Sequence, residues 1–198
     1  MRKAIVFILT LTSIFNLSGC HMNTWNSEEY DPRGYYPKQE AIYNEETLKE
    51  ILACFDNKDF DTLIEMFSIS VKSEYNLVSQ IEKAYEIYGG ESVSYESFWD
   101  FGTISLGMDY GVCVEKSIGA EMRNIKTTNN DNFNISFMRY IVNDSNPHML
   151  GISGISLSDP EYGNLAIIGP VDDQDLKILK ENNQKRNGNK SSENSDVD

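Results

Sequence analysis

The chain has 198 residues, a hydrophobic fraction of 40% and a formal net charge of −14, which suits one globular domain with flexible ends. This acidity excludes nucleic acid as a partner, because phosphate backbones repel a protein with such an excess of negative charge. A solvated acidic surface that keeps the domain soluble is the simplest use of the charge.

Residues 1–19 have the pattern of a bacterial lipoprotein signal peptide. Two basic residues precede the apolar run Ala4–Leu17, and Leu17-Ser18-Gly19-Cys20 is similar to a lipobox. A helix of about 14 residues spans about 21 Å, less than the roughly 30 Å of a bilayer core. We therefore expect cleavage before Cys20, lipidation of Cys20, and a protein anchored at the extracytoplasmic face of the cell membrane.

Residues 20–43 are polar and contain Pro32, Gly34 and Pro37, which interrupt any periodic pattern. They are predicted to form a tether between the lipid and the folded domain.

Three helices are predicted next. Asn44 is expected to be the N-cap of the first, with acids in its first turn. Asp59 should cap a second, short helix, and a third should run to about Tyr88 and end at Gly89-Gly90. The apolar residues that recur at helical spacing on these segments are Leu48, Ile51, Leu52, Phe55, Leu63, Ile81, Ala84 and Tyr85.

After Gly90 the period changes to two, which predicts strands. In the first strand, Val93, Tyr95, Trp99 and Phe101 share one face, whereas Asp100 lies on the other face with Ser94 and Glu96. Further strands are expected near residues 111–125, 133–142 and 148–157, joined by Asn-rich turns. Short turns between consecutive strands predict an antiparallel sheet.

The C-terminal part should add an edge strand at 165–168 and a short helix at 171–180. From Glu181 the composition is almost free of apolar residues, which predicts a folded domain over 44–182 and a disordered tail over 183–198.

Helices followed by a strand meander indicate an α+β fold, with N-terminal helices packed on a strongly curved antiparallel sheet. The order resembles the nuclear-transport-factor-two-like, or cystatin-like cone, superfamily, and Glu45–Ser68 is similar to its opening helices. The mature chain also resembles uncharacterised lipoproteins of Gram-positive bacteria grouped as domain of unknown function 5104. That likeness rests on Gln80–Ala84, Val93–Tyr95 and Gly151–Leu157. It implies a pocket between helices and sheet, and no established activity.

Enzymes of that superfamily place an Asp, His or Tyr inside the cone for proton transfer, so Asp100 and His148 are the candidate catalytic residues. Alternation places Asp100 on the less apolar face, where solvent exposure is expected. His148 follows Pro147, and a turn or strand-end histidine is the alternative reading. The candidate pocket residues, for which core packing is the alternative, are Tyr85, Tyr88, Tyr95, Trp99 and Phe101.

Cys54 and Cys113 stand in apolar surroundings, where buried free thiols are expected and a disulfide is the alternative. No motif for a metal or a cofactor is present, so none is expected. The pattern favours a membrane-anchored module that binds a small ligand or an envelope protein. The alternatives are a small cone-fold isomerase, dehydratase or hydrolase, and a structural protein with a filled cone.

Overall fold

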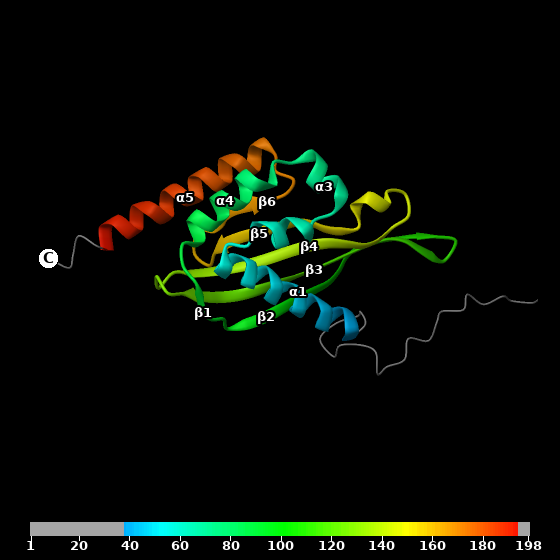
Figure 1. Cartoon of the computed structure of the whole chain (residues 1–198), viewed down its shortest axis with the longest axis horizontal. Helices are drawn as coiled ribbons and strands as arrows, with labels where there is room; N and C mark the ends of the chain where they lie inside the picture. The colour runs from blue at the N-terminus through cyan, green and yellow to red at the C-terminus, as the bar shows by residue number, and fades with distance from the viewer. Residues whose placement is uncertain (1–37, 194–198) are drawn as a thin grey trace, which may run out of the picture.

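The computed structural model describes residues 38–193, with side chains over residues 40–189 (Figure 1). The predictions of a signal peptide, of lipidation at Cys20 and of a tether at 20–37 fall outside the described residues. The helices are α1 Lys38–Asn57, α2 Phe60–Glu65, α3 Ile69–Glu74, α4 Leu77–Tyr88 and α5 Asp173–Glu193. The strands are β1 Ser92–Ser94, β2 Ser97–Asp109, β3 Val112–Thr127, β4 Asn132–Asn143, β5 Gly151–Asp159 and β6 Gly163–Ile168, with a 3-10 turn, η1, at Pro147–Met149.

The strands form one antiparallel sheet in which β3, β4, β5 and β6 are neighbours in chain order. Both β1 and β2 pair with β3, and the sheet is not closed. This confirms the α+β class and the antiparallel pairing. The predicted long first strand is two strands, because Tyr95 and Glu96 interrupt the regular pairing between β1 and β2.

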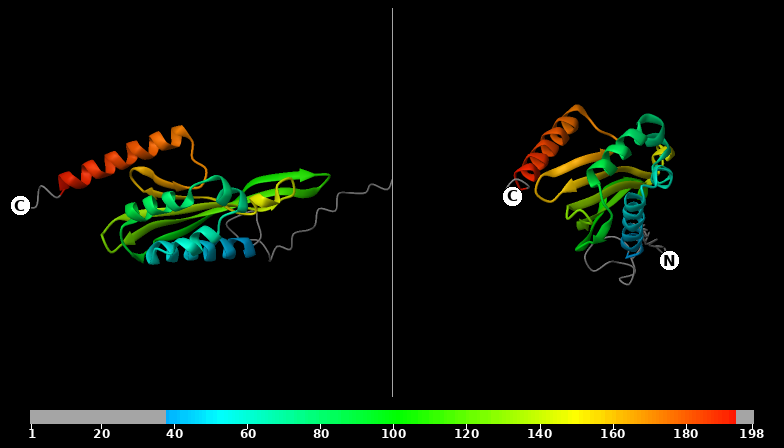
Figure 2. Two further views of the ribbon diagram at one scale, coloured as in Figure 1. Left: turned by 45° about the horizontal axis from the view of Figure 1, so that its top comes forward. Right: turned by 60° about the vertical axis from the view of Figure 1, so that its left-hand side comes forward.

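Helices α1 to α4 lie on one face of the sheet (Figure 2). Their predicted apolar stripes are buried against the strands, and each large side chain removed from water contributes roughly 1.5–3 kcal/mol. The fully buried members include Leu48, Ile51, Phe55, Leu63, Ile81 and Tyr88 from the helices and Met122, Ile125, Phe133 and Ile135 from the sheet.

Local capping follows the sequence. The carboxylate of Asp59 accepts a hydrogen bond from Thr62 N at 3.1 Å, as an N-cap residue does. Helix α4 ends at Gly89 with φ 67°, a left-handed conformation that glycine adopts without steric cost. Both predicted boundaries are confirmed.

The first helix begins at Lys38, so the prediction that Asn44 caps it is wrong. Tertiary contacts stabilise the additional turn, since Ala41 is 3% exposed and Lys116 Nζ lies 2.7 Å from Glu40 Oε1. Residues 38–43 therefore belong to the domain rather than to the tether.

The predicted disorder after Glu181 is also corrected, because α5 continues to Glu193. This helix lies along β6 (Figure 1). Polar side chains attach it: Asn183 Nδ2 donates to Leu165 O at 2.8 Å, and Asn182 Nδ2 donates to Asn164 O at 2.9 Å. The composition does not predict this helix, because hydrogen bonds to a strand rather than buried apolar residues hold it in place.

Within residues 38–193, no helix has the length and apolarity that crossing a bilayer requires.

Candidate functional site

A buried cation lies under the first half of α1. Arg139 of β4 is 6% exposed, and its guanidinium carbon lies 3.7 Å from the centroid of the Tyr43 ring of α1. Its Nε has no hydrogen-bond partner, and no ion pair within 4.0 Å includes Arg139 among the side chains of residues 40–189. The aromatic ring is thus the closest partner that the described part of the chain offers this charge.

Burial lowers the pKa of the Arg139 guanidinium, while the negative charges of Glu40 and Asp100 act in the opposite direction. A guanidinium stays protonated in proteins even so. Removing an ion from water costs several kcal/mol unless a counter-charge compensates it. We therefore expect Arg139 to destabilise the unliganded domain.

A cavity of about 140 Å³ adjoins Arg139. Tyr43, Thr47 and Glu50 line it from one face of α1, because they are spaced by four and three residues. The opposite wall consists of Met66, Gly151 and Ile152. Its volume is close to the roughly 150 Å³ of an engineered cavity that holds benzene, so the site has room for a small molecule.

The opposite wall depends on a glycine. Gly151 has φ +118°, and a Cβ there would lie 3.1 Å from Ser68 N and 3.2 Å from Ser68 Cα. This close approach lets Ile152 N donate to Met66 O at 3.1 Å and Ser68 N donate to Ile152 O at 2.9 Å. The loop after α2 and the start of β5 are thereby joined beside the cavity.

Asp100 points toward α1, which corrects the prediction that it is exposed. Its Oδ1 accepts hydrogen bonds from Asn44 Nδ2 at 3.2 Å and from Gly102 N at 3.1 Å. Asp100 Oδ2 and Asn44 Oδ1 are buried without a hydrogen-bond partner among the described residues. Two acceptors under one helix add to the polar layer around Arg139.

Lys116 and Glu40 complete this layer. Lys116 Nζ lies 2.7 and 2.9 Å from the two carboxylate oxygens of Glu40, and its side chain is 11% exposed. The pair attaches the first turn of α1 to β3. Glu40 is therefore already paired and does not act as the direct partner of Arg139.

Tyr85 and Tyr88 are core residues, which agrees with the alternative prediction of core packing. Their rings pack edge-on against Phe55, with centroids 5.0 and 5.3 Å away. Tyr85 OH donates to Asp59 O at 3.2 Å and Tyr88 OH donates to Asp56 Oδ1 at 3.0 Å. Burial raises the pKa of both hydroxyls. Neither residue lines the Arg139 cavity.

Trp99 and Phe101 lie away from the helices, with exposed fractions of 54 and 43%, and Tyr95 is 41% exposed between β1 and β2. The sequence therefore assigned the wrong face of β2 to the core. The Arg123 guanidinium carbon lies 4.7 Å from the Trp99 ring centroid. Phe101 lines a shallow groove of about 220 Å³ with Ile104, Ser136, Gly154 and Ile167.

His148 is exposed in the η1 turn, as the turn reading predicted. Asp100 lies under α1, where its hydrogen-bond partners are Asn44 and Gly102 rather than His148. The structure thus does not assemble the candidate pair Asp100 and His148.

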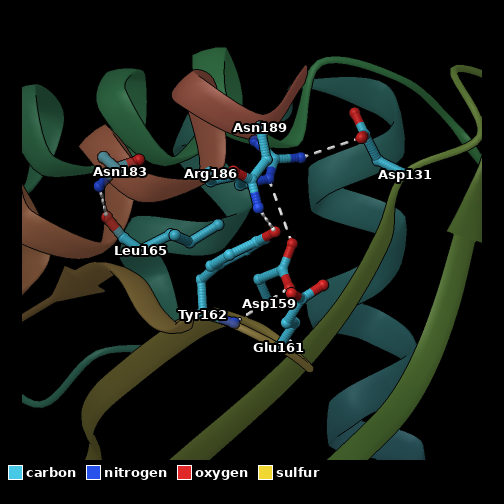
Figure 3. A network of polar contacts seen from close by, with 8 residues as sticks. All are labelled: Asp131, Asp159, Glu161, Tyr162, Leu165, Asn183, Arg186 and Asn189. Atoms are coloured by element: carbon cyan, nitrogen blue, oxygen red, sulfur yellow. Dashed lines mark hydrogen bonds and ion pairs between the residues drawn. The ribbon is translucent and has the colours of Figure 1, made fainter. Parts of the chain in front are cut away.

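A second buried arginine, unlike Arg139, forms ion pairs with carboxylates. Arg186 of α5 is 6% exposed and reaches two carboxylates, Asp131 Oδ1 at 3.1 Å and Asp159 Oδ2 at 3.2 Å (Figure 3). Its guanidinium carbon also lies 4.8 Å from the Phe133 ring centroid. The carboxylates stand at the β3–β4 and β5–β6 turns, so this cluster attaches α5 to the sheet.

Cys54 and Cys113 are free thiols, so the alternative prediction of a disulfide between them is wrong for this structure. Burial raises the pKa of the Cys54 thiol to about 11 from its ordinary 9.0. Because the folded state retains this proton more strongly, the stability linked to it is present below pH 9.0 and declines as the pH rises toward 11.

Thiol labelling tests this difference. In the folded mature protein at pH 8, maleimide is expected to modify the half-buried Cys113 and to leave the buried Cys54 unmodified until urea unfolds the domain. Mass spectrometry of tryptic peptides over time measures the two rates. Equal rates would contradict the burial of Cys54.

No group of three or more His, Cys, Asp or Glu side chains among the described residues is arranged to hold a metal ion. The sequence did contain a signal for Arg139. Phe133, Ile135 and Phe137 alternate on the core face of β4, and Arg139 continues the same parity.

Comparison with known protein families identifies a family whose function is unknown. A family model described as Domain of unknown function (DUF5104) matches residues 50–160, which is more than half of the chain. The match includes Glu50, Asp100 and Arg139, whereas Tyr43 and Asn44 lie before it. No curated protein matches the sequence.

Proposed function

We propose, for this chain, which belongs to the DUF5104 family, a role as an extracytoplasmic, membrane-anchored module that binds a small anionic ligand under α1. One observation supports the site: Arg139 is 6% exposed, its Nε lacks a hydrogen-bond partner, and it borders a cavity. An anion would supply the missing counter-charge, and a carboxylate matches the planar fork of a guanidinium.

Carboxylate titration tests the site. The mature protein is expected to bind propionate, and Arg139→Met should weaken binding about tenfold to a hundredfold, because it removes charge-assisted hydrogen bonds. Calorimetry measures the affinity. Arg123→Met, on the opposite face of the sheet, serves as the control. Equal binding by the protein and its Arg139→Met variant would contradict the proposal.

Lipidation at Cys20 gives the proposal its location. Cys20→Ala is expected to abolish incorporation of radiolabelled palmitate, because the lipobox cysteine accepts the diacylglycerol. Continued labelling of the variant would refute the anchor. An envelope protein remains an alternative ligand for an anchored module of this kind.

The fold proposed for this module is the cystatin-like cone of the nuclear-transport-factor-two-like superfamily. The support is the order of elements, with helices followed by an antiparallel sheet, and the position of the cavity between α1 and the sheet.

A second candidate function is a small isomerase, dehydratase or hydrolase. The buried Asp100 Oδ2 without a partner favours it, because a carboxylate shielded from water suits proton transfer. Asp100→Asn would then abolish turnover while retaining propionate binding.

A further inference from the structure

The Arg139 cavity contains one charge of each sign. Two of its lining residues are Arg139, which is 6% exposed, and Glu50 of α1, which is exposed. No ion pair among the described side chains includes Glu50. The cavity therefore offers two unpaired charges, one for an anionic group and one for a cationic group.

The charge of the whole chain opposes a simple anion. With a formal net charge of −14, the protein repels free anions at long range. A ligand that carries a carboxylate and an ammonium group has no net charge and avoids this repulsion. Electrostatics at long range and in the cavity thus favour the same ligand class.

The remaining lining supplies a place for each part of such a ligand. Thr47 Oγ1 donates its proton to Tyr43 O at 2.8 Å, so the lone pairs of this hydroxyl can accept from an ammonium group. Met66 and Ile152 provide an apolar wall for a short side chain. The volume of about 140 Å³ limits that side chain to a few atoms.

We infer that the ligand is a small zwitterionic amino acid whose carboxylate pairs with Arg139 and whose ammonium group pairs with Glu50. This inference rests on the proposed function, since it needs the anion site. The two charged side chains come from β4 and α1, so the ligand would connect the helix to the sheet.

Calorimetry with alanine, propionate and ethylamine on the mature protein tests the inference. Alanine is expected to bind about two- to fivefold more tightly than propionate, the range of one partly exposed ion pair, and ethylamine not measurably. Glu50→Gln should abolish the preference for alanine and strengthen propionate binding slightly, because it removes a like charge from the cavity that holds the carboxylate. Glu86→Gln on α4 removes an exposed acid that does not line the cavity, and should change neither affinity.

The outcomes separate the two proposals. If alanine and propionate bind equally and both depend on Arg139, the zwitterionic ligand is wrong and the anion site stands. A preference for alanine that persists in Glu50→Gln also overturns the inference. If neither compound binds, both proposals fail.

Discussion

Arg139→Met is expected to raise the free energy of unfolding of the unliganded protein by about 1–4 kcal/mol. The guanidinium is 6% exposed and its Nε lacks a hydrogen-bond partner. Methionine keeps much of the aliphatic volume and removes the charge that must be desolvated on folding. Binding sites often contain residues that lower the stability of the unliganded fold, because those residues are retained for function. Urea denaturation followed by circular dichroism measures the change.

Arg123→Met is the control for this measurement. Arg123 also lies beside an aromatic ring, but its side chain is 40% exposed and pairs with Glu121. Its replacement should change stability only slightly, since exposed ion pairs contribute little. A clear loss of stability in Arg139→Met would show that the guanidinium is structural and would contradict a ligand site.

Arg186→Met is expected to lower the free energy of unfolding by about 2–4 kcal/mol. Asp131 and Asp159, with side chains 16 and 14% exposed, would then remain largely buried without their shared cation. Helix α5 should lose its attachment at this point, because its contacts with the sheet are largely to β6. Hydrogen exchange of the α5 amides, measured by mass spectrometry, should therefore become faster.

Lys185→Met provides the comparison, since Lys185 neighbours Arg186 in the helix and is exposed. It should leave both exchange and stability almost unchanged. Unaltered protection of α5 in Arg186→Met would mean that the hydrogen bonds of Asn182 and Asn183 to β6 suffice to hold the helix.

The two arginines are equally buried, so burial alone does not distinguish their roles. Arg186 has carboxylates from two turns within 3.2 Å, whereas Arg139 has the Tyr43 ring. Opposite signs for the two stability changes would separate an ion pair that holds the fold from a charge kept for a ligand.

Local patterns predicted the helices and strands that have strong periodicity. The apolar stripe of α4, the cap at Asp59, the left-handed Gly89 and the strand at 133–142 all depend on neighbours within a few residues. These features can be predicted from the sequence because the interactions that specify them are local.

The site around Arg139 and Asp100 can be predicted from the sequence only in part. The sequence indicates Asp100 as a candidate but predicts that it is exposed, and it predicts that Trp99 and Phe101 face the helices, whereas the structure shows the opposite arrangement. Alternation divides a strand into two faces without saying which face the helices will cover. Arg139 was missed because a single arginine in an apolar strand has no meaning until the packing shows whether a counter-charge is near.

The amino-acid sequence by itself determined the α+β class, the antiparallel meander and the boundaries that caps and glycines specify, since each follows from backbone preferences and periodicity. The tertiary structure alone decided the outward face of β2, the extension of α5 and the burial of Arg139 beside a cavity. Those features depend on contacts between segments far apart in the chain, and on which charges those contacts leave unpaired.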